Sequence, residues 1–270
     1  MGKLDRQKFR FLNHLHIPYP YFNSFKIPIE QHFMKKIGIL ATFVVALFTS
    51  CSESEYEFHQ TYFTPQEPNG KILYADQVSD STRVISYDPW TASTYFNNGT
   101  DAWFSITPTE CNFKAGEQFA SMRINIQGSV NNTGKIRSGH IVVKSYDTVG
   151  MPVKQTTWLN IIRPFGEVEK YDATGNQLPE ENRKMTFKGQ TIATANQFEI
   201  EFIVYSNDAT LTSDAEWLIP ATTTFNAGRH VVAIIAQENF ATQPRTATLT
   251  LSSNGISTPI TITQAKTNNQ

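Results

Sequence analysis

The stretch FEIEFIVYS, residues 198–206, carries the pattern that decides the fold. Phe198, Ile200 and Phe202 share one face of an extended chain, and the two glutamates between them lie on the other face. A repeat of two residues is the repeat of a half-buried β-strand, because successive side chains of a strand point to opposite sides of the sheet. This stretch therefore predicts a strand with one face in a core.

The same alternation recurs toward the C-terminus, in TATLTLSS and TPITITQ. In both stretches threonine fills most outward positions, and β-branched residues favour strands over helices. After Cys51 the sequence shows no amphipathic pattern of helical period. Several short strands separated by turn residues indicate an all-β protein of the β-sandwich class.

A long internal repeat divides this β region into two parts. DAWFSITPTECNFKAGEQFASMRINIQG, from Asp101, aligns with DAEWLIPATTTFNAGRHVVAIIAQEN, from Asp214. Trp103 matches Trp217, and the segment FKAG matches FNAG. Downstream, RSGHIVVKS matches RTATLTLSS in the same order. We expect Trp103 and Trp217 to occupy equivalent buried positions in two similar domains.

The repeat sets the expected domain boundaries at residues 72–164 and 185–266. Residues 165–184 join them and form a linker or a hairpin. Within this joining segment, DATGN at residues 172–176 combines an acidic residue, a glycine and an asparagine, as calcium-binding loops do. It lacks the further acidic ligands and the closing glutamate of an EF-hand, so a turn is the favoured interpretation.

The second copy carries an ordered set of residues that points to a family. The set is Trp217, Leu218, Phe225, Gly228, Asn239, Arg245, Ala247, Leu249, Leu251, Ile260, Ile262 and Gln264. It resembles the BACON domain, a name that stands for Bacteroidetes-associated carbohydrate-binding often N-terminal. The first copy keeps Trp103, Gly116 and Arg137 but continues differently, in QTTWLNIIRP. The resemblance implies two tandem immunoglobulin-like β-sandwiches with a carbohydrate-binding role.

An export signal is indicated by MKKIGILATFVVALFTSC, residues 34–51. Two lysines precede a predominantly apolar run of 12 residues, a length that suits a signal peptide and is shorter than the ~20 residues of a membrane-spanning helix. Small residues then lead to Cys51, which is similar to the lipobox of bacterial lipoproteins. The resemblance implies cleavage before Cys51 and acylation of that cysteine.

This interpretation assigns the remaining N-terminal residues and a location. Residues 1–33 become an extension that is not part of the protein, residues 34–50 the lipoprotein signal peptide, and residues 51–71 a flexible tether rich in polar and acidic residues. The anchor implies the outer membrane, at the cell surface or on its periplasmic face. Residues 51–270 carry 16 Lys+Arg and 22 Asp+Glu, a balance that does not favour nucleic-acid binding.

Catalytic chemistry finds little support in the sequence. Cys111 is the one cysteine left if Cys51 is acylated, and no catalytic signature surrounds it, so we expect a small buried residue. The sequence contains no zinc-type spacing, glycine-rich phosphate loop or nucleophile elbow. We therefore predict that the protein is not an enzyme and uses neither cofactor nor metal.

Binding residues are sought among the tryptophans that the repeat does not share. An exposed indole can stack on the apolar face of a sugar ring. Trp90 and Trp158 face small residues of the other copy in the alignment, about Ala209 and Thr261, and are the carbohydrate-binding candidates. The alternative for Trp158 is packing against the joining segment or the second domain.

Three classes of function remain open. They are a surface glycan-binding lipoprotein, a structural spacer that holds an envelope protein partner away from the membrane, and an adhesion subunit. Two tripeptides, Asp80-Ser81-Thr82 and Asp147-Thr148-Val149, resemble a short O-glycosylation motif, with ordinary loop hydroxyls as the alternative.

Overall fold

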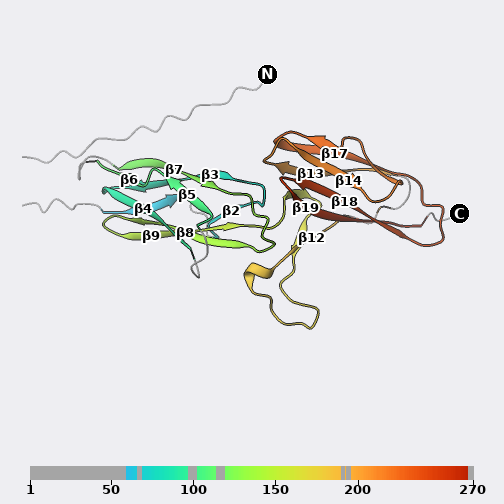
Figure 1. Cartoon of the computed structure of the whole chain (residues 1–270), viewed down its shortest axis with the longest axis horizontal. Helices are drawn as coiled ribbons and strands as arrows, with labels where there is room; N and C mark the ends of the chain where they lie inside the picture. The colour runs from blue at the N-terminus through green and yellow to red at the C-terminus, as the bar shows by residue number, and fades with distance from the viewer. Residues whose placement is uncertain are drawn as a thin grey trace, which may run out of the picture. The chain divides into compact units, whose positions relative to one another are not determined.

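The computed structural model describes residues 59–65, 69–96, 102–113, 119–189, 192 and 196–266 (Figure 1). The export signal, Cys51 and Gly116 lie outside these residues. Regular structure in the described ranges is β, except for one turn of 3-10 helix, η2 (Glu180–Asn182). None of the described residues forms a helix that could cross a membrane. The all-β prediction is confirmed.

The first sandwich consists of two facing sheets. One sheet has the order β1-β3-β7-β5, and the other has the order β2-β9-β8-β4-β6. The strands of the first sheet are β1 (Thr61–Thr64), β3 (Ser79–Ser86), β7 (Ala120–Gly128) and β5 (Phe104–Thr107). Those of the second are β2 (Lys71–Leu73), β9 (Thr148–Gln155), β8 (Arg137–Lys144), β4 (Trp90–Phe96) and β6 (Glu110–Cys111).

The second sandwich repeats this strand order. Its sheets run β10-β13-β17-β15 and β12-β19-β18-β14-β16, with β11 added at one edge. The first sheet contains β10 (Asn160–Arg163), β13 (Asn196–Val204), β17 (Gly228–Ala236) and β15 (Leu218–Pro220). The second contains β11 (Gly166–Val168), β12 (Met185–Lys188), β19 (Ile256–Gln264), β18 (Arg245–Ser253), β14 (Ala209–Ser213) and β16 (Thr224–Phe225). Even the one parallel pairing recurs, as β2 with β9 and as β12 with β19.

Each sandwich has a core built from the alternating strands. In β18 the inward residues Ala247, Leu249 and Leu251 are buried, as the pattern predicts. Strand β13 also follows its pattern, with one qualification. Glu201 points away from the core but is buried, because Arg229 bonds to its carboxylate and Arg163 lies 3.5 Å from it. A buried carboxylate needs such partners, since removing a charge from water is costly.

A tight hairpin joins β18 to β19. Asn254 and Gly255 form its two-residue turn, with φ values of 50° and 76°. Positive φ at both positions is the geometry that matches the twist of two antiparallel strands, and Asn-Gly is its preferred sequence. The turn fixes the register of β18 on β19, which pair over nine residues from Arg245↔Gln264 to Ser253↔Ile256.

The joining segment, residues 165–184, is a protruding excursion rather than a bare linker (yellow in Figure 1). Strand β11 pairs with β12, and the chain between them turns back at Asp172. The Asp172 carboxylate accepts hydrogen bonds from the backbone N–H groups of Thr174 and Asn176, at 2.9 and 2.8 Å. These bonds stabilise the turn, and the hydrogen bond from the Thr174 hydroxyl is the first reason that the pKa of Asp172 is lowered.

Candidate functional site

Trp103 and Trp217 occupy equivalent places in the two sandwiches. Each lies just before the strand β5 or β15, and its backbone carbonyl accepts a hydrogen bond from the residue after β7 or β17: Ser129 at 3.2 Å and Gln237 at 2.8 Å. Trp103 is buried, whereas Trp217 is half-buried. The expectation of equal burial is wrong for Trp217, which is only partly buried where it packs against the second core, and the Arg245 guanidinium lies 4.3 Å from the centre of its ring.

Trp90 cannot serve as a stacking platform, which corrects the prediction from the sequence. Its side chain is 2% exposed and belongs to the core of the first sandwich. It lies opposite Cys111 in the pairing of β4 with β6. At the same place in the second sandwich, Ala209 lies opposite Phe225. The large residue thus comes from β4 in one copy and from β16 in the other, so both copies fill the same space.

Trp158 is half-buried and packs against the core of the second sandwich. Its backbone carbonyl accepts a hydrogen bond from Ala75 of the first sandwich at 3.1 Å. This placement agrees with the alternative that the sequence left open, in which Trp158 contacts the second domain. The counterpart assigned to Trp158, Thr261, is wrong. Arg137 pairs with Gln155 as Arg245 pairs with Gln264, so the first copy ends its last strand before Trp158.

The place where the two sandwiches meet contains a buried acidic residue, Asp76. Its Oδ2 accepts hydrogen bonds from the backbone N–H of Tyr205 and from the hydroxyl of Ser253, both at 3.0 Å. Among the described residues, Asp76 Oδ1 has no hydrogen-bond partner. Burial raises the pKa of Asp76 above its usual value, because the charged form loses its contact with water. Asp76 thus links the first sandwich to the second.

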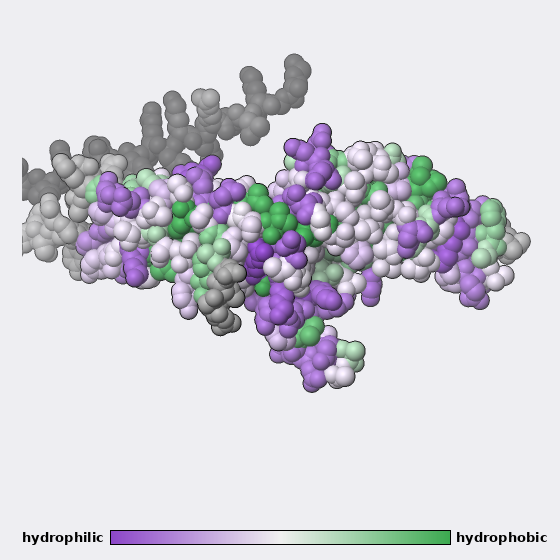
Figure 2. All heavy atoms as spheres, in the orientation of Figure 1, coloured by the Kyte–Doolittle hydropathy of each residue, from purple (hydrophilic) through white to green (hydrophobic). Residues whose placement is uncertain are grey.

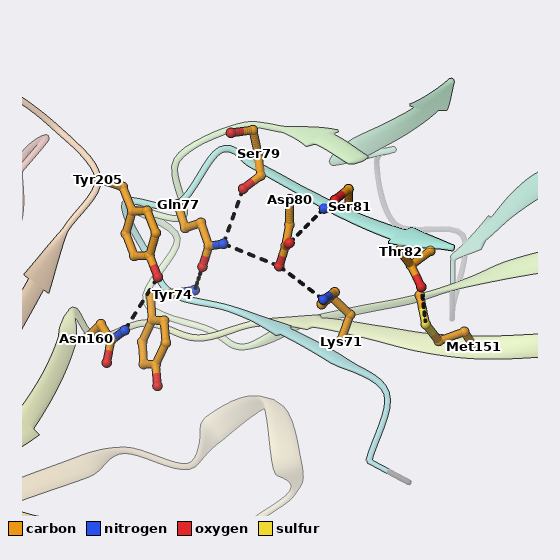
Figure 3. A network of polar contacts seen from close by, with 10 residues as sticks. All are labelled: Lys71, Tyr74, Gln77, Ser79, Asp80, Ser81, Thr82, Met151, Asn160 and Tyr205. Carbon is orange, nitrogen blue, oxygen red and sulfur yellow. Dashed lines mark hydrogen bonds and ion pairs between the residues drawn. The ribbon is translucent and has the colours of Figure 1, made fainter. Parts of the chain in front are cut away.

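Two tyrosines lie at the same junction, one from each sandwich (Figure 3). The rings of Tyr74 and Tyr205 are stacked, with centroids 6.5 Å apart and planes at 17°. Tyr205 is 36% exposed, and Asn160 Nδ2 donates to its hydroxyl at 3.4 Å. Burial of the rings raises the pKa of both hydroxyls, so both keep their protons at neutral pH.

A polar rim continues from the tyrosines along β2 and the start of β3 (Figure 3). Lys71 Nζ lies 3.6 Å from Asp80 Oδ2, and Gln77 Nε2 donates to the same carboxylate oxygen at 3.4 Å. We call these residues, together with the two tyrosines and Asn160, the junction cluster. Its members are Lys71, Tyr74, Gln77, Asp80, Asn160 and Tyr205.

The chemistry of the junction cluster suits binding. It combines an aromatic face with an amide, a carboxylate and an ammonium group, the kinds of groups that fix a polar ligand in a binding site. In the part of the chain that the structure describes, no three His, Cys, Asp or Glu residues gather as a metal would require.

The sequence alone did not point to Tyr74 or Tyr205. One signal was available, because a tyrosine follows the same strand in both copies: Tyr87 after β3 and Tyr205 after β13. The exposure of such a residue depends on what the other sandwich covers, which the sequence does not reveal. The alternating pattern around Phe198 predicted the strand, but it did not predict whether Tyr205, at the end of that strand, is exposed or buried.

The two glycosylation-like tripeptides lie in different environments. Ser81 is half-buried within β3, its backbone N–H donates to the Asp80 carboxylate at 2.6 Å, and Thr82 is buried. Thr148 is exposed at the start of β9, next to the β8–β9 turn. Only Thr148 has the exposure that a modifying enzyme would need.

Comparison with known protein families finds one match, and it lies in the second sandwich. Residues 206–265, within the second sandwich, match the family model "BACON: Putative binding domain, N-terminal". The match covers one copy and is to a binding domain. No curated protein matches the chain.

Several solved structures show a limited similarity to this chain. A Bacteroides ovatus GH5 xyloglucanase in complex with a XXXG heptasaccharide is 20% identical over 32% of this chain, with a TM-score of 0.27. This chain spans 18% of the xyloglucanase chain. The E. coli chaperone DraB is 9% identical (75% of this chain, 97% of that chain, TM-score 0.29), and the D0-D1 domain of intimin is 12% identical (74% and 96%, TM-score 0.25).

Proposed function

We propose that the protein is a non-catalytic lipoprotein of the outer membrane that binds or presents glycan at the cell surface, with the junction cluster as its contact surface. The observation that carries the proposal is the stacked pair Tyr74 and Tyr205, set beside hydrogen-bonding side chains. The family match to a binding domain, which begins at the residue after Tyr205, supports it. A partly exposed aromatic pair offers a small apolar face, so we expect modest affinity for each site.

The proposed ligand is a polysaccharide with accessible pyranose faces. Tyr205 would stack on such a face, held by the buried Asn160 behind its hydroxyl, and Asp80 and Lys71 would meet hydroxyl groups at its rim. Carboxylates and amides of this kind accept and donate hydrogen bonds to a polyol without changing their own charge. Polar contacts of fixed geometry would give selectivity among sugars.

The test is a titration of the folded protein with a panel of host and plant polysaccharides, by calorimetry and gel retardation. Tyr205→Ala should weaken binding by roughly 0.5–1.5 kcal/mol, about two- to thirteenfold, because one aromatic contact is lost. Tyr205→Phe should keep most of the affinity, since the ring remains. Tyr171→Ala is the matched control, because Tyr171 is 63% exposed but lies on the excursion.

A structural spacer is the second candidate, and the buried contacts at the junction favour it. Asp76 and Trp158 fasten one sandwich to the other, and Lys154 Nζ also bonds to Glu180 of the excursion at 2.6 Å. A spacer that holds an envelope protein partner off the membrane needs such a fixed joint and no ligand. A flat titration across the whole panel, with folding confirmed, would leave the spacer as the surviving function.

The proposed anchor is Cys51, after removal of residues 34–50 and of any residues before them. Two or more acyl chains would hold the protein stably, at about 0.8 kcal/mol for each buried methylene. Intact mass of the membrane-extracted protein should show an acylated N-terminus at Cys51. Cys51→Ala should leave the chain without lipid or uncut, and a wild-type mass that still includes residues 1–33 would refute this assignment.

A further inference from the structure

One end of the first sandwich collects several exposed aromatic rings. Ser86, the last residue of β3, pairs with Thr61 of β1 and with Ala120 of β7. The residues just before β1, just after β3 and just before β7 therefore meet at this end. The β8–β9 turn joins them, because Ser145 Oγ and Thr61 Oγ1 share a hydrogen bond. We call this end the terminal face, formed by His59, Tyr87, Asp88, Phe119 and Tyr146.

The exposed rings of the terminal face, those of Tyr146 and Phe119, each pack against another ring of that face. Tyr146, 71% exposed, stacks on His59 with centroids 4.1 Å apart and planes at 10°. His59 Nδ1 lies 2.9 Å from Asp88 Oδ1, which holds the imidazole in place. Phe119, 51% exposed, lies 5.7 Å from the Tyr87 ring. The two outer rings are thus held ready for contact, so little conformational entropy is lost when something covers them.

The equivalent end of the second sandwich contacts another domain, the first sandwich, and allows a comparison with the terminal face. There, the backbone N–H of Tyr205 donates to Asp76 of the first sandwich at 3.0 Å. The corresponding N–H in the first sandwich, that of Tyr87, donates to the carbonyl of Gln60 in its own sandwich at 3.1 Å. Because this donor is already used, another sandwich with an inserted carboxylate does not fit the terminal face as Asp76 fits the second sandwich.

The chain itself indicates a different occupant. His59 is the eighth residue after Cys51, and eight extended residues span at most roughly 26–29 Å. Acylation at Cys51 would therefore keep the terminal face within that distance of the lipid. Tyrosine is enriched where membrane meets water, because its ring is apolar and its hydroxyl is polar.

The geometry points to the terminal face as a surface that rests on the lipid bilayer, with Tyr146 and Phe119 entering the headgroup region. This inference depends on the proposed anchor at Cys51. Lys144 and Asp147 flank Tyr146 with opposite charges, so the contact should be driven by the rings rather than by lipid charge. The bilayer contact would orient the protein, with the first sandwich next to the membrane.

The test uses the full chain, expressed in a bacterium that processes lipoproteins and reconstituted in phosphatidylcholine vesicles whose acyl chains carry bromine. Tyr146→Trp places a fluorophore on the terminal face. Phe240→Trp is the matched control, because Phe240 is 81% exposed in the loop after β17 of the second sandwich. Bromine should quench the added emission of Tyr146→Trp, and 1 M salt should not abolish the quenching. The emission added by Phe240→Trp should remain unquenched.

The outcomes separate this inference from the proposed anchor. Intact mass reports acylation at Cys51 in the same samples. Acylated protein in which Tyr146→Trp and Phe240→Trp are quenched equally, or in which neither is quenched, would overturn the contact and leave the anchor intact. Protein without acyl chains would overturn both. As a second measure, the pair Phe119→Ala and Tyr146→Ala should increase the access of a protease to the terminal face on vesicles, and equal access would count against the contact.

Discussion

Asp76 accepts a hydrogen bond from the backbone of Tyr205 at 3.0 Å, although the two residues are 129 positions apart. The bond crosses from the first sandwich to the second, and Ser253 adds another to the same oxygen. A buried carboxyl group needs such hydrogen-bond donors, because burial removes it from bulk water. The joint between the sandwiches therefore includes a side chain that can titrate.

The first prediction concerns pH. The folded-state pKa of Asp76 lies above its ordinary 3.8, so the folded state binds a proton more tightly than the unfolded state does. Its contribution to stability is complete below the unfolded pKa and is lost as the pH rises through the raised, folded pKa. Asp76→Asn should remove this component, since the amide oxygen can accept both hydrogen bonds at any pH. Urea unfolding across this acidic range should show a difference between variant and wild type that changes with pH, and parallel curves would contradict the prediction.

The second prediction concerns the core pair Trp90 and Cys111. Trp90→Ala should lower the free energy of unfolding by about 3–5 kcal/mol, because it leaves a cavity. Cys111→Phe alone should cost about 1–3 kcal/mol through overpacking. Together they recreate the Ala209 and Phe225 pair of the second sandwich, so the double variant should be more stable than the sum of the single effects by about 0.5–3 kcal/mol. Chemical denaturation measures all three.

The control for these three variants, which form a double-mutant cycle, is Phe240→Ala. Phe240 is exposed, so its loss should change the free energy of unfolding by no more than about 0.5 kcal/mol. Strict additivity of the Trp90 and Cys111 substitutions would show that the two side chains do not share a space.

The third prediction compares two arginines at equivalent positions. Arg245 donates to Gln264 Oε1 at 2.7 Å and to two backbone carbonyls, and it covers Trp217. Arg137 donates to Ser129 Oγ at 3.0 Å, and the buried Gln155 Oε1 beside it has no partner among the described residues. Arg245→Ala should therefore destabilise its sandwich by about 1.5–3 kcal/mol, more than Arg137→Ala does. The unfolding midpoints of the two variants decide this, and an equal loss would refute it.

The fourth prediction concerns cooperation between the sandwiches. Trp158 packs on the second core while its carbonyl bonds to Ala75. Trp158→Ala should weaken this coupling, so that urea unfolding, followed by fluorescence and by circular dichroism, separates into two steps. Lys154→Ala is the comparison, because its ion pair with Glu180 is largely exposed and should contribute about 0–1 kcal/mol. A single, unshifted transition for Trp158→Ala would show that the joint lies elsewhere.

The strands could be predicted from sequence because their signal is local. Residues 198–206 and the threonine-rich strands alternate in a way that only a half-buried sheet explains. The equivalence of Trp103 and Trp217 followed from the order of landmarks, and the shared backbone hydrogen bonds agree with it. Fold class therefore needed no knowledge of contacts between distant residues.

The candidate site could not be predicted because it depends on contacts that the sequence does not display. Trp90 was unshared and therefore looked available, but the small Cys111 opposite makes room for it inside the core. Tyr205 belongs to the candidate site because its ring stacks on Tyr74, which the other sandwich contributes. Burial of a ring at a strand end is decided by its neighbours in space, so pattern alone could not separate the two cases.

The exchange of sizes between Trp90–Cys111 and Ala209–Phe225 also bears on how the chain avoids misfolding. Tandem domains of similar sequence can trade strands with one another during folding. If β4 took the place of β14, Trp90 would meet Phe225 and crowd that core, while Ala209 would meet Cys111 and leave a void. We expect both hybrids to be less stable than the native pairs, so the exchange of large and small residues between the two strands favours correct strand pairing in two domains of similar sequence.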